Sequence, residues 1–340
     1  MFIVESYGLA VALCWVTMLC WGSWGNTQKL SAQTWRYELF YWDYVIGILL
    51  FSLVWGLTLG SIGEGGRGFM QDLQQVGMEN FWSAFLGGVI FNASNILLSA
   101  SMSLAGMLVA FPIGVGLVLG VFVNYFSVPK GDPVTLFGGV FLIVLAIVFN
   151  GIASGKVSEV SGQTVRKRGV LIAVCAGILM AFFYRFVAAA MDLENLESPA
   201  VGMMTPYSAL FVFAIGIFIS NFLFNSLLMR KPFTGVPVAY SQYFKGNMNT
   251  HLVGIFGGCH LGVGNSVQLY CCRNSRCCHF LWVGTRGYDG CRIMGGYLEG
   301  IQRGSKSTNL LIVLMFVLFF LGLALIITSC LLYTSDAADE

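Results

Sequence analysis

Charged residues are scarce in this sequence. Asp, Glu, Lys and Arg together make up 10% of the 340 residues, whereas soluble domains contain about 25%. Hydrophobic residues make up 57%, and the mean hydropathy is +0.78. This composition excludes an ordinary soluble domain and predicts a protein that crosses the lipid bilayer several times.

Several functions are disfavoured because the residues that they need are missing. The net charge is only +2, and no basic cluster is interleaved with aromatic residues, so nucleic acid is not expected as a partner. The chain has three histidines and neither a phosphate-binding loop nor a nucleophile elbow, which argues against an ATP-driven pump or an enzyme. We therefore assign no catalytic residue and no cofactor.

Ten apolar runs are candidates for membrane-spanning helices, which need about 20 residues each. They lie at 6–24, 38–60, 82–101, 104–126, 134–152, 169–190, 204–228, 251–269, 276–298 and 308–329. They do not alternate as barrel strands do, and they are rich in Gly, Ala and Ser, which lets helices approach closely in lipid. The predicted fold is an all-α membrane protein of about ten transmembrane helices.

A glycine and asparagine motif occurs twice. In both Gly87–Asn95 and Gly257–Asn265, a Gly-Gly pair precedes an Asn by eight and seven residues. The second copy follows the first by half of the chain length. Such a repeat in a hydrophobic chain predicts a duplicated transporter scaffold, with chance as the alternative because the chain contains 42 glycines.

Five spans in each half force the second half to insert upside down, which predicts two inverted five-helix repeats. We place the repeats at 1–152 and 169–329, joined by a basic polar linker at 153–168. Lys and Arg concentrate in the loops after spans one, five and seven. By the positive-inside rule these loops are cytoplasmic, and both termini lie outside.

Two segments do not resemble native membrane protein. Six cysteines at 259–291 have the appearance of a zinc site, but they stand among arginines where a span is due. With codons that the genetic code permits, reading the chain from Tyr270 one base later yields a Gly/Ala-rich helix that matches the first half at the same half-chain offset. We therefore interpret 267–303 as frameshifted and assign no metal site. The polar tail 330–340 is interpreted as a translated sequencing adapter.

The end of the first span and the start of the second are rich in aromatic and amide side chains. Trp21 and Trp24 can stack on a flat or sugar-like solute, and Asn26 can hydrogen-bond to it. Tyr41 follows at the start of the second span. The alternative is an aromatic belt at the membrane interface.

Two charges are expected inside the membrane. Asp43 lies in the second span and Arg185, next to Tyr184, in the sixth. An intramembrane charge is a candidate for proton coupling or for a structural ion pair, and these two residues would pair if they met. Snorkelling to the interface is the other possibility for each.

Three asparagines stand in apolar spans. Asn92 and Asn95 are three residues apart and share one face of a helix, and Asn265 lies in the eighth span. They either bind polar groups of a substrate near the membrane midplane or hydrogen-bond neighbouring helices.

These motifs resemble the drug/metabolite transporter superfamily, and within it the branch of glucose/ribose porters and ureide permeases. The resemblance rests on Trp21–Asn26, on Tyr41–Tyr44 and on the paired Gly-Gly…Asn elements. It implies ten spans, a central cavity between the halves, and secondary transport by alternating access with proton coupling.

We expect a permease that moves a small polar solute, most readily a sugar, across the bacterial cytoplasmic (inner) membrane. Its partners are the solute, protons and the lipid bilayer. The alternatives are an exporter of drugs or amphipathic metabolites, and a membrane enzyme or scaffold that transports nothing.

Overall fold

The computed structural model describes residues 1–2, 7–31, 35–63, 65–105, 132–160, 167–192, 195, 199–233, 235–271 and 306–336. Every regular element within these ranges is a helix, and the β pairing found there is one isolated bridge between Met191 and Met204. The predicted all-α class is confirmed for this part of the chain.

The described helices follow the predicted apolar runs. They are α1 (Tyr7–Ser31), α2 (Tyr37–Leu57), α3 (Phe69–Gln75), α4 (Met78–Ala105), α6 (Pro133–Val160), α7 (Lys167–Ala189), α8 (Pro206–Arg230), α9 (Tyr240–Tyr243), α10 (Met248–Cys271) and α13 (Lys306–Asp336). Each long helix overlaps a predicted span, and α3 and α9 are short helices in the segments that precede α4 and α10. The expected spans at 104–126 and 276–298 lie almost entirely outside the described residues.

Five of the described helices are long and apolar enough to cross a membrane. These stretches are Tyr37–Leu57, Met78–Leu104, Leu171–Ala189, Pro206–Arg230 and Ser307–Ile326. α6 adds a shorter apolar stretch, Pro133–Phe149, and α10 carries polar side chains such as His251, His260 and Asn265 along its length. Helix length and composition therefore support a multi-pass membrane protein.

Two helices extend beyond the expected domain boundaries. α6 continues through Val160, so the first part of the expected linker 153–168 is helical. α13 continues through Asp336, into the expected tail 330–340. Neither extension contains proline, so the helical hydrogen bonds propagate past the apolar run. Most of the segment interpreted as frameshifted, 272–305, lies outside the described residues.

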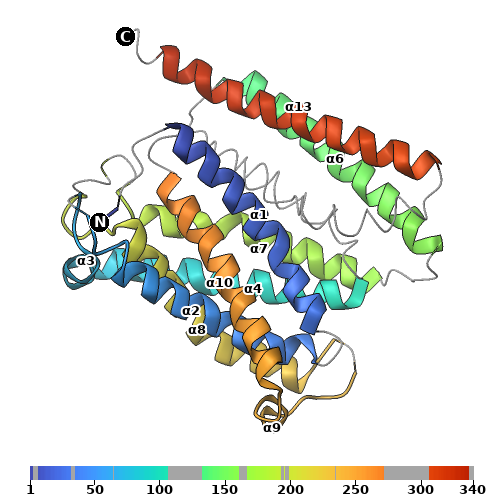
Figure 1. Ribbon diagram of the computed structural model, residues 1–340, viewed down its shortest axis with the longest axis horizontal. Helices are drawn as coiled ribbons and strands as arrows, with labels where there is room; N and C mark the ends of the chain where they lie inside the picture. The colour runs from blue at the N-terminus through green and yellow to red at the C-terminus, as the bar shows by residue number, and fades with distance from the viewer. Residues whose placement is uncertain are drawn as a thin grey trace.

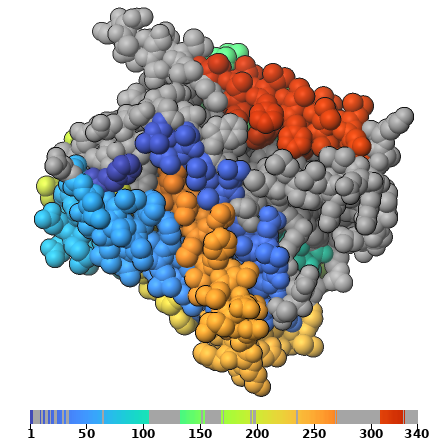
Figure 2. Space-filling view, in the orientation of Figure 1, coloured from blue at the N-terminus to red at the C-terminus, as the bar shows by residue number. Residues whose placement is uncertain are grey.

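The principal helix contacts join the first half of the chain to the second. α4 packs on α7 and α8, and α10 packs on α1 and α2. α2 also packs on α8, and α6 lies along α13 at one edge of the bundle (Figure 1). The space-filling view shows α10 on the surface of the molecule, lying against α2 (Figure 2). Each of these contacts has one member before residue 161 and one after residue 166.

Glycines set the two closest helix crossings. At the α4–α8 crossing, a Cβ added to Gly88 or to Gly216 would overlap a backbone carbonyl of the other helix. At the α2–α10 crossing, the same holds for Gly47 and Gly258. The second glycine of each repeated motif therefore lies where two helices are in backbone contact, as small residues in membrane helices allow.

Candidate functional site: a buried layer of Asn and Tyr side chains

A hydrogen-bonded layer of polar side chains connects α2, α4 and α8. Tyr41 Oη donates to Asn92 Oδ1 at 3.0 Å, and Asn92 Nδ2 donates to Ser220 Oγ at 2.9 Å. One turn along α4, Asn95 Nδ2 donates to the hydroxyls of Tyr44 at 3.0 Å and Tyr41 at 3.3 Å. All five side chains are buried. We call this set the Asn–Tyr layer.

Aromatic rings of α1 lie beside the Asn–Tyr layer. The Trp24 ring is centred 5.2 Å from the ring of Tyr44, at an interplanar angle of 38°. Trp21 meets Phe91 edge-on at 6.0 Å. Two of the residues predicted to contact a solute, Trp21 and Trp24, are therefore buried, Trp24 against Tyr44 of the Asn–Tyr layer and Trp21 against Phe91, the residue before Asn92.

The chemistry of the Asn–Tyr layer suits a polar, uncharged solute. A buried amide or hydroxyl is costly unless it is hydrogen-bonded, and here the donors and acceptors satisfy one another across three helices. Each amide presents both a donor and an acceptor, and each phenol can do either. These groups can exchange a partner on a neighbouring helix for one on a solute.

The other predicted contact residues lie apart from the Asn–Tyr layer. Asn265 is 4% exposed on α10, and neither of its amide atoms has a hydrogen-bond partner in the described part of the chain. Asn26 is half-buried on α1. Tyr184 is buried on α7, where its ring meets Phe183 edge-on.

Asp43, near the start of α2, faces the segment that contains α9 and α10. His251 Nδ1 lies 2.9 Å from Asp43 Oδ2, and Tyr243 Oη donates to Asp43 Oδ1 at 2.6 Å. Trp35 stacks on Tyr243 and meets His251 edge-on, with centroids 5.6 Å and 4.6 Å away. Burial and the hydrogen bond to Asp43 raise the pKa of the Tyr243 phenol, so it remains a donor. We call these four residues the Asp43 cluster.

The structure does not bring Asp43 and Arg185 together. Arg185 lies on α7 with an exposed side chain, and α7 packs on α4. Asp43 instead faces α10, where a Cβ added to Gly254 would lie against the Asp43 side chain. Its basic neighbour among the described residues is therefore His251.

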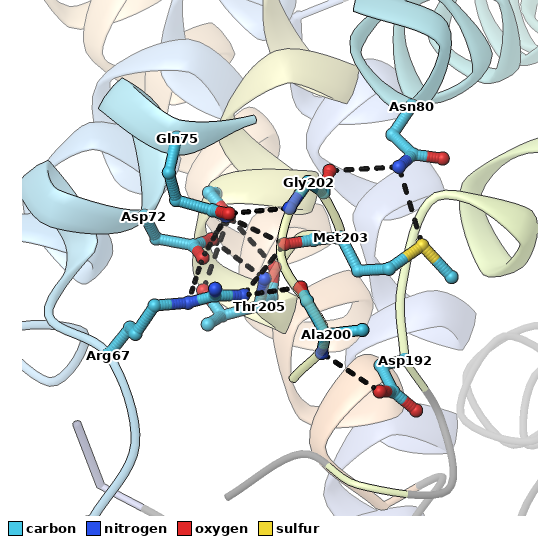
Figure 3. Close-up of polar contacts among 10 residues, drawn as sticks. Arg67, Asp72, Gln75, Asn80, Asp192, Ala200, Gly202, Met203 and Thr205 are labelled. Atoms are coloured by element: carbon cyan, nitrogen blue, oxygen red, sulfur yellow. Dashed lines mark hydrogen bonds and ion pairs between the residues drawn. The ribbon is translucent and has the colours of Figure 1, made fainter. Parts of the chain in front are cut away.

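A second polar cluster joins α3 to the start of α8 (Figure 3). Asp72 is fully buried, and its Oδ2 accepts hydrogen bonds from the backbone N–H of Thr205 at 2.7 Å and from the Ser208 hydroxyl. Its Oδ1 lies 3.1 Å from Arg67 Nε and 3.1 Å from Gln75 Nε2. A carboxylate at a helix N-terminus is favoured by the helix dipole. We call these five residues the Asp72 cluster.

Arg67 and Gln75 also hold the backbone that precedes α8 (Figure 3). An Arg67 guanidinium nitrogen donates to the carbonyls of Ala200 at 3.2 Å and Met203 at 2.9 Å. Gln75 donates to the Met203 carbonyl at 2.9 Å and accepts from the Gly202 N–H at 2.6 Å. The segment between α2 and α4 is thereby fastened to the segment between α7 and α8.

The Asp43 and Asp72 clusters lie at opposite ends of the bundle. Asp43 is in the second turn of α2, whereas the Asp72 cluster follows the end of α2, where the Phe69 N–H donates to the Gly60 carbonyl. α8 begins at the Asp72 cluster and ends near Asp43, where Asn225 Nδ2 donates to the Glu38 carbonyl at 2.9 Å. The Asn–Tyr layer lies between the two ends.

Sequence reasoning missed several of these residues. His251 had a usable signal, because it is the histidine that stands outside the cysteine-rich stretch. Asp72 had a weaker one, as an acid inside an amphipathic loop segment. Ser220 and Tyr243 had none, since a serine in a span and a tyrosine in a loop are both common and their partners are distant in sequence.

The comparisons with known proteins place the chain beside permeases. The chain is 23% identical to Ureide permease 1 and 23% identical to Ureide permease 2, both of Arabidopsis thaliana, over 97% of this chain and 99% of each relative. It is 22% identical to Probable ureide permease A3 of Vigna unguiculata over 90% of this chain and 99% of that protein. No family model matches the chain.

A solved crystal structure shares the fold. It aligns with a TM-score of 0.61 at 14% identity and covers 97% of this chain and 99% of that chain. The curated relatives are permeases by name, and permeases are transporters rather than enzymes. They support the prediction of a transporter for small polar metabolites.

Proposed function

We propose that this chain is a secondary active transporter that moves a small polar, uncharged metabolite across the membrane by alternating access. The observation that carries the proposal is the Asn–Tyr layer, a buried set of amide and hydroxyl groups in the middle of a bundle of apolar helices. Relatives named as permeases over nearly the whole chain support the same class.

The proposed architecture is two inverted five-helix repeats, ten spans in all. In such a repeat, α1, α2 and α4 correspond to α7, α8 and α10. The helix contacts support this, because the α4–α8 crossing then corresponds to the α10–α2 crossing, and the α4–α7 contact corresponds to the α10–α1 contact. Gly88 and Gly258, which stand half of the chain length apart, occupy matching places in the two crossings. Inverted repeats of this kind underlie alternating access in many transporters.

The short helices after α2 and α8 supply a further correspondence. The Phe69 N–H donates to the Gly60 carbonyl at 2.9 Å, and the Val238 N–H donates to the Met229 carbonyl at 2.9 Å. Gly60 is as far from Met229 along the chain as Phe69 is from Val238, and both separations are close to half of the chain. The same local turn therefore follows α2 at one end of the bundle and α8 at the other.

Alternating access requires a gate at each end of the solute site, and the two polar clusters have that placement. The Asp43 cluster ties α2 to α10 at one end, and the Asp72 cluster ties α3 to α8 at the other. Opening one cluster while the other stays closed exposes the Asn–Tyr layer to one side of the membrane.

Proton coupling is proposed for Asp43 together with His251. A carboxylate and an imidazole 2.9 Å apart can share one proton, which either residue can bind. Protonation would neutralise Asp43 and loosen its hold on His251 and Tyr243. Loading a proton and opening this end of the bundle are thereby linked.

Two solute classes compete for the Asn–Tyr layer. The sequence favours a sugar, because Trp21 and Trp24 offer faces on which a sugar ring stacks. The names of the curated relatives favour a ureide. Trp21, Trp24, Tyr41, Asn92 and Asn95 are the proposed contacts in either case, with Asn26, Tyr184 and Asn265 on neighbouring helices. The bacterial inner membrane and the outside location of both termini stay predictions of the sequence.

Uptake into proteoliposomes tests the proposal. The purified full chain is reconstituted, and accumulation of a labelled sugar and of a labelled ureide is measured with and without an inward proton gradient. We expect one of the two to accumulate above its equilibrium level only when the gradient is present. The absence of protein-dependent uptake of either solute refutes the proposed function.

A further inference from the structure

One fully buried amide in α8 has no hydrogen-bond partner among the residues that the structure describes. Asn221 is 0% exposed, and neither its Nδ2 nor its Oδ1 makes a hydrogen bond within the described part of the chain. Its two neighbours along α8 are engaged. Ser220 Oγ accepts from Asn92 Nδ2 at 2.9 Å, and the Phe222 ring meets the Trp42 ring at 5.0 Å. Its neighbours place Asn221 on the part of α8 that packs on α2 and α4, directly after Ser220 of the Asn–Tyr layer.

The residue one turn later shows what a structural asparagine in this helix does. Asn225 is also 0% exposed, and its Nδ2 donates to the Glu38 carbonyl of α2 at 2.9 Å, whereas its Oδ1 has no partner among the described residues. That bond holds two helices together. Asn221 is on the same face of α8 four residues earlier and is equally buried, but it makes no hydrogen bond to another described residue.

An unpartnered buried amide is a cost that the empty protein carries. Removing such a group from water without giving it a hydrogen bond is unfavourable, and a leucine of nearly the same shape would avoid the penalty. The asparagine at this position is explained if its partner is a bound molecule. The amide presents one donor and one acceptor side by side, the complement of another amide or urea edge.

We propose that Asn221 is a specificity-determining residue that reads the amide or urea edge of the transported solute. The inference rests on the proposed transport function and deepens it by naming the residue that selects between the two candidate solute classes in favour of the ureide. A urea edge, which carries N–H and C=O groups side by side, fills both unpaired atoms of Asn221 at once. The adjoining Asn–Tyr layer then contacts the rest of the solute.

The first test compares the thermal stability of Asn221→Leu and Asn225→Leu in detergent, without any solute. If Asn221 waits for a ligand, its replacement removes an unsatisfied group and raises the Tm of the empty protein by a few degrees. Asn225→Leu removes the bond to Glu38 and lowers the Tm. An Asn221→Leu protein that unfolds, or whose Tm falls as that of Asn225→Leu does, overturns the proposal.

The second test uses hydantoin, a cyclic ureide, and its N,N′-dimethyl derivative, which lacks both N–H donors. Each is added to the purified wild-type protein and to Asn221→Leu, and the ligand-induced rise in Tm is titrated. We expect wild type to bind hydantoin at least about tenfold more tightly than the dimethyl compound, which corresponds to about 1.4 kcal/mol. Asn221→Leu should bind the two alike.

The outcomes separate this inference from the proposed function. One outcome is that wild type accumulates solute in proteoliposomes and Asn221→Leu still prefers hydantoin over its dimethyl derivative as strongly as wild type does. This outcome refutes the role of Asn221 and leaves transport standing. Wild type that binds hydantoin through Asn221 but moves no solute refutes transport and leaves the binding residue standing. Wild type that does not distinguish hydantoin from its dimethyl derivative overturns the proposed ligand class.

Discussion

The Asp72 cluster makes the sharpest prediction about how one end of the bundle is held closed. In Asp72→Asn the side chain keeps its shape, but one oxygen becomes an NH₂ group. Oδ2 of Asp72 accepts two hydrogen bonds, and Oδ1 accepts one from Gln75 and forms the ion pair with Arg67. Replacing Oδ2 removes the acceptor of two hydrogen bonds, and replacing Oδ1 removes the acceptor of the Gln75 hydrogen bond and the atom that pairs with Arg67. In both cases two contacts are lost and Arg67 loses its counter-charge.

The size of the effect follows from these contacts. A hydrogen bond to a charged group contributes about 1.5–3 kcal/mol, so losing two contacts of this kind costs about 3–6 kcal/mol. The Arg67 side chain is 24% exposed, and water offsets part of its loss, which favours the lower end of the range. A loss of about 3 kcal/mol raises the open population of this end by about a hundredfold.

Hydrogen exchange measured by mass spectrometry reports that population through amides that do not touch Asp72. The Gly77 N–H donates to the Gly202 carbonyl at 3.0 Å, and the Phe69 N–H donates to the Gly60 carbonyl. Both should exchange about a hundredfold faster in Asp72→Asn if the segment opens as a unit. The Val238 N–H, at the other end of the bundle, should keep its wild-type rate.

Asp192→Asn is the matched control, because it makes the same chemical change in the segment that Asp72 fastens. Asp192 accepts from the backbone N–H groups of Asn195 and Ala200 at 3.1 Å each, in exposed positions. Figure 3 shows the contact with Ala200. Its loss should change exchange at Gly77 by less than about fivefold, for a contribution of about 1 kcal/mol or less. Wild-type exchange at Gly77 in Asp72→Asn would refute the gate assignment.

Two further predictions use single substitutions. Gly88→Ala should lower the Tm in detergent, because a Cβ at Gly88 overlaps a backbone carbonyl. Gly138→Ala should leave the Tm unchanged, because the atom nearest to a Cβ at Gly138 is a side-chain carbon 4.0 Å away. Equal stability of the two variants contradicts the close crossing. Asp43→Asn and His251→Gln should each abolish the response of uptake to a proton gradient, while solute exchange across the membrane continues. Gradient-driven uptake that persists in Asp43→Asn removes Asp43 from the coupling mechanism.

The sequence predicts the helices well because burial in lipid is decided by composition. A run of about 20 apolar residues has few alternatives to a helix, and each long helix of the described chain overlaps a predicted run. The repeated glycine motif also has direct physical content, because Gly88 and Gly258 lie at helix crossings. Hydropathy alone does not predict that α6 and α13 continue into polar residues.

The site is only partly predictable for a different reason. Asp43 is identified from its own position, since a carboxylate inside a span is costly. Its partner His251 lies in the other half of the chain, and which face of α10 meets α2 depends on the packing of both helices. The Asp72 cluster is harder still, because it joins two loop segments whose polar residues are ordinary in sequence.

The two halves differ in the way that their asparagines are satisfied. Asn265 corresponds to Asn95 under the proposed repeat, half of the chain length later. Asn95 donates to two tyrosine hydroxyls of α2. The separation between Gly60 and Met229, applied to those tyrosines, makes Leu210 and Phe213 their equivalents in the second half. Both side chains are buried and offer no hydrogen-bond acceptor. The first half therefore supplies four of the five side chains of the Asn–Tyr layer, whereas the second half carries Asn265 and Asn221, whose amides have no hydrogen-bond partner among the described residues. Under the proposal for Asn221, a solute with a urea edge gains more from the second half, since there it satisfies amide groups that no other described residue pairs.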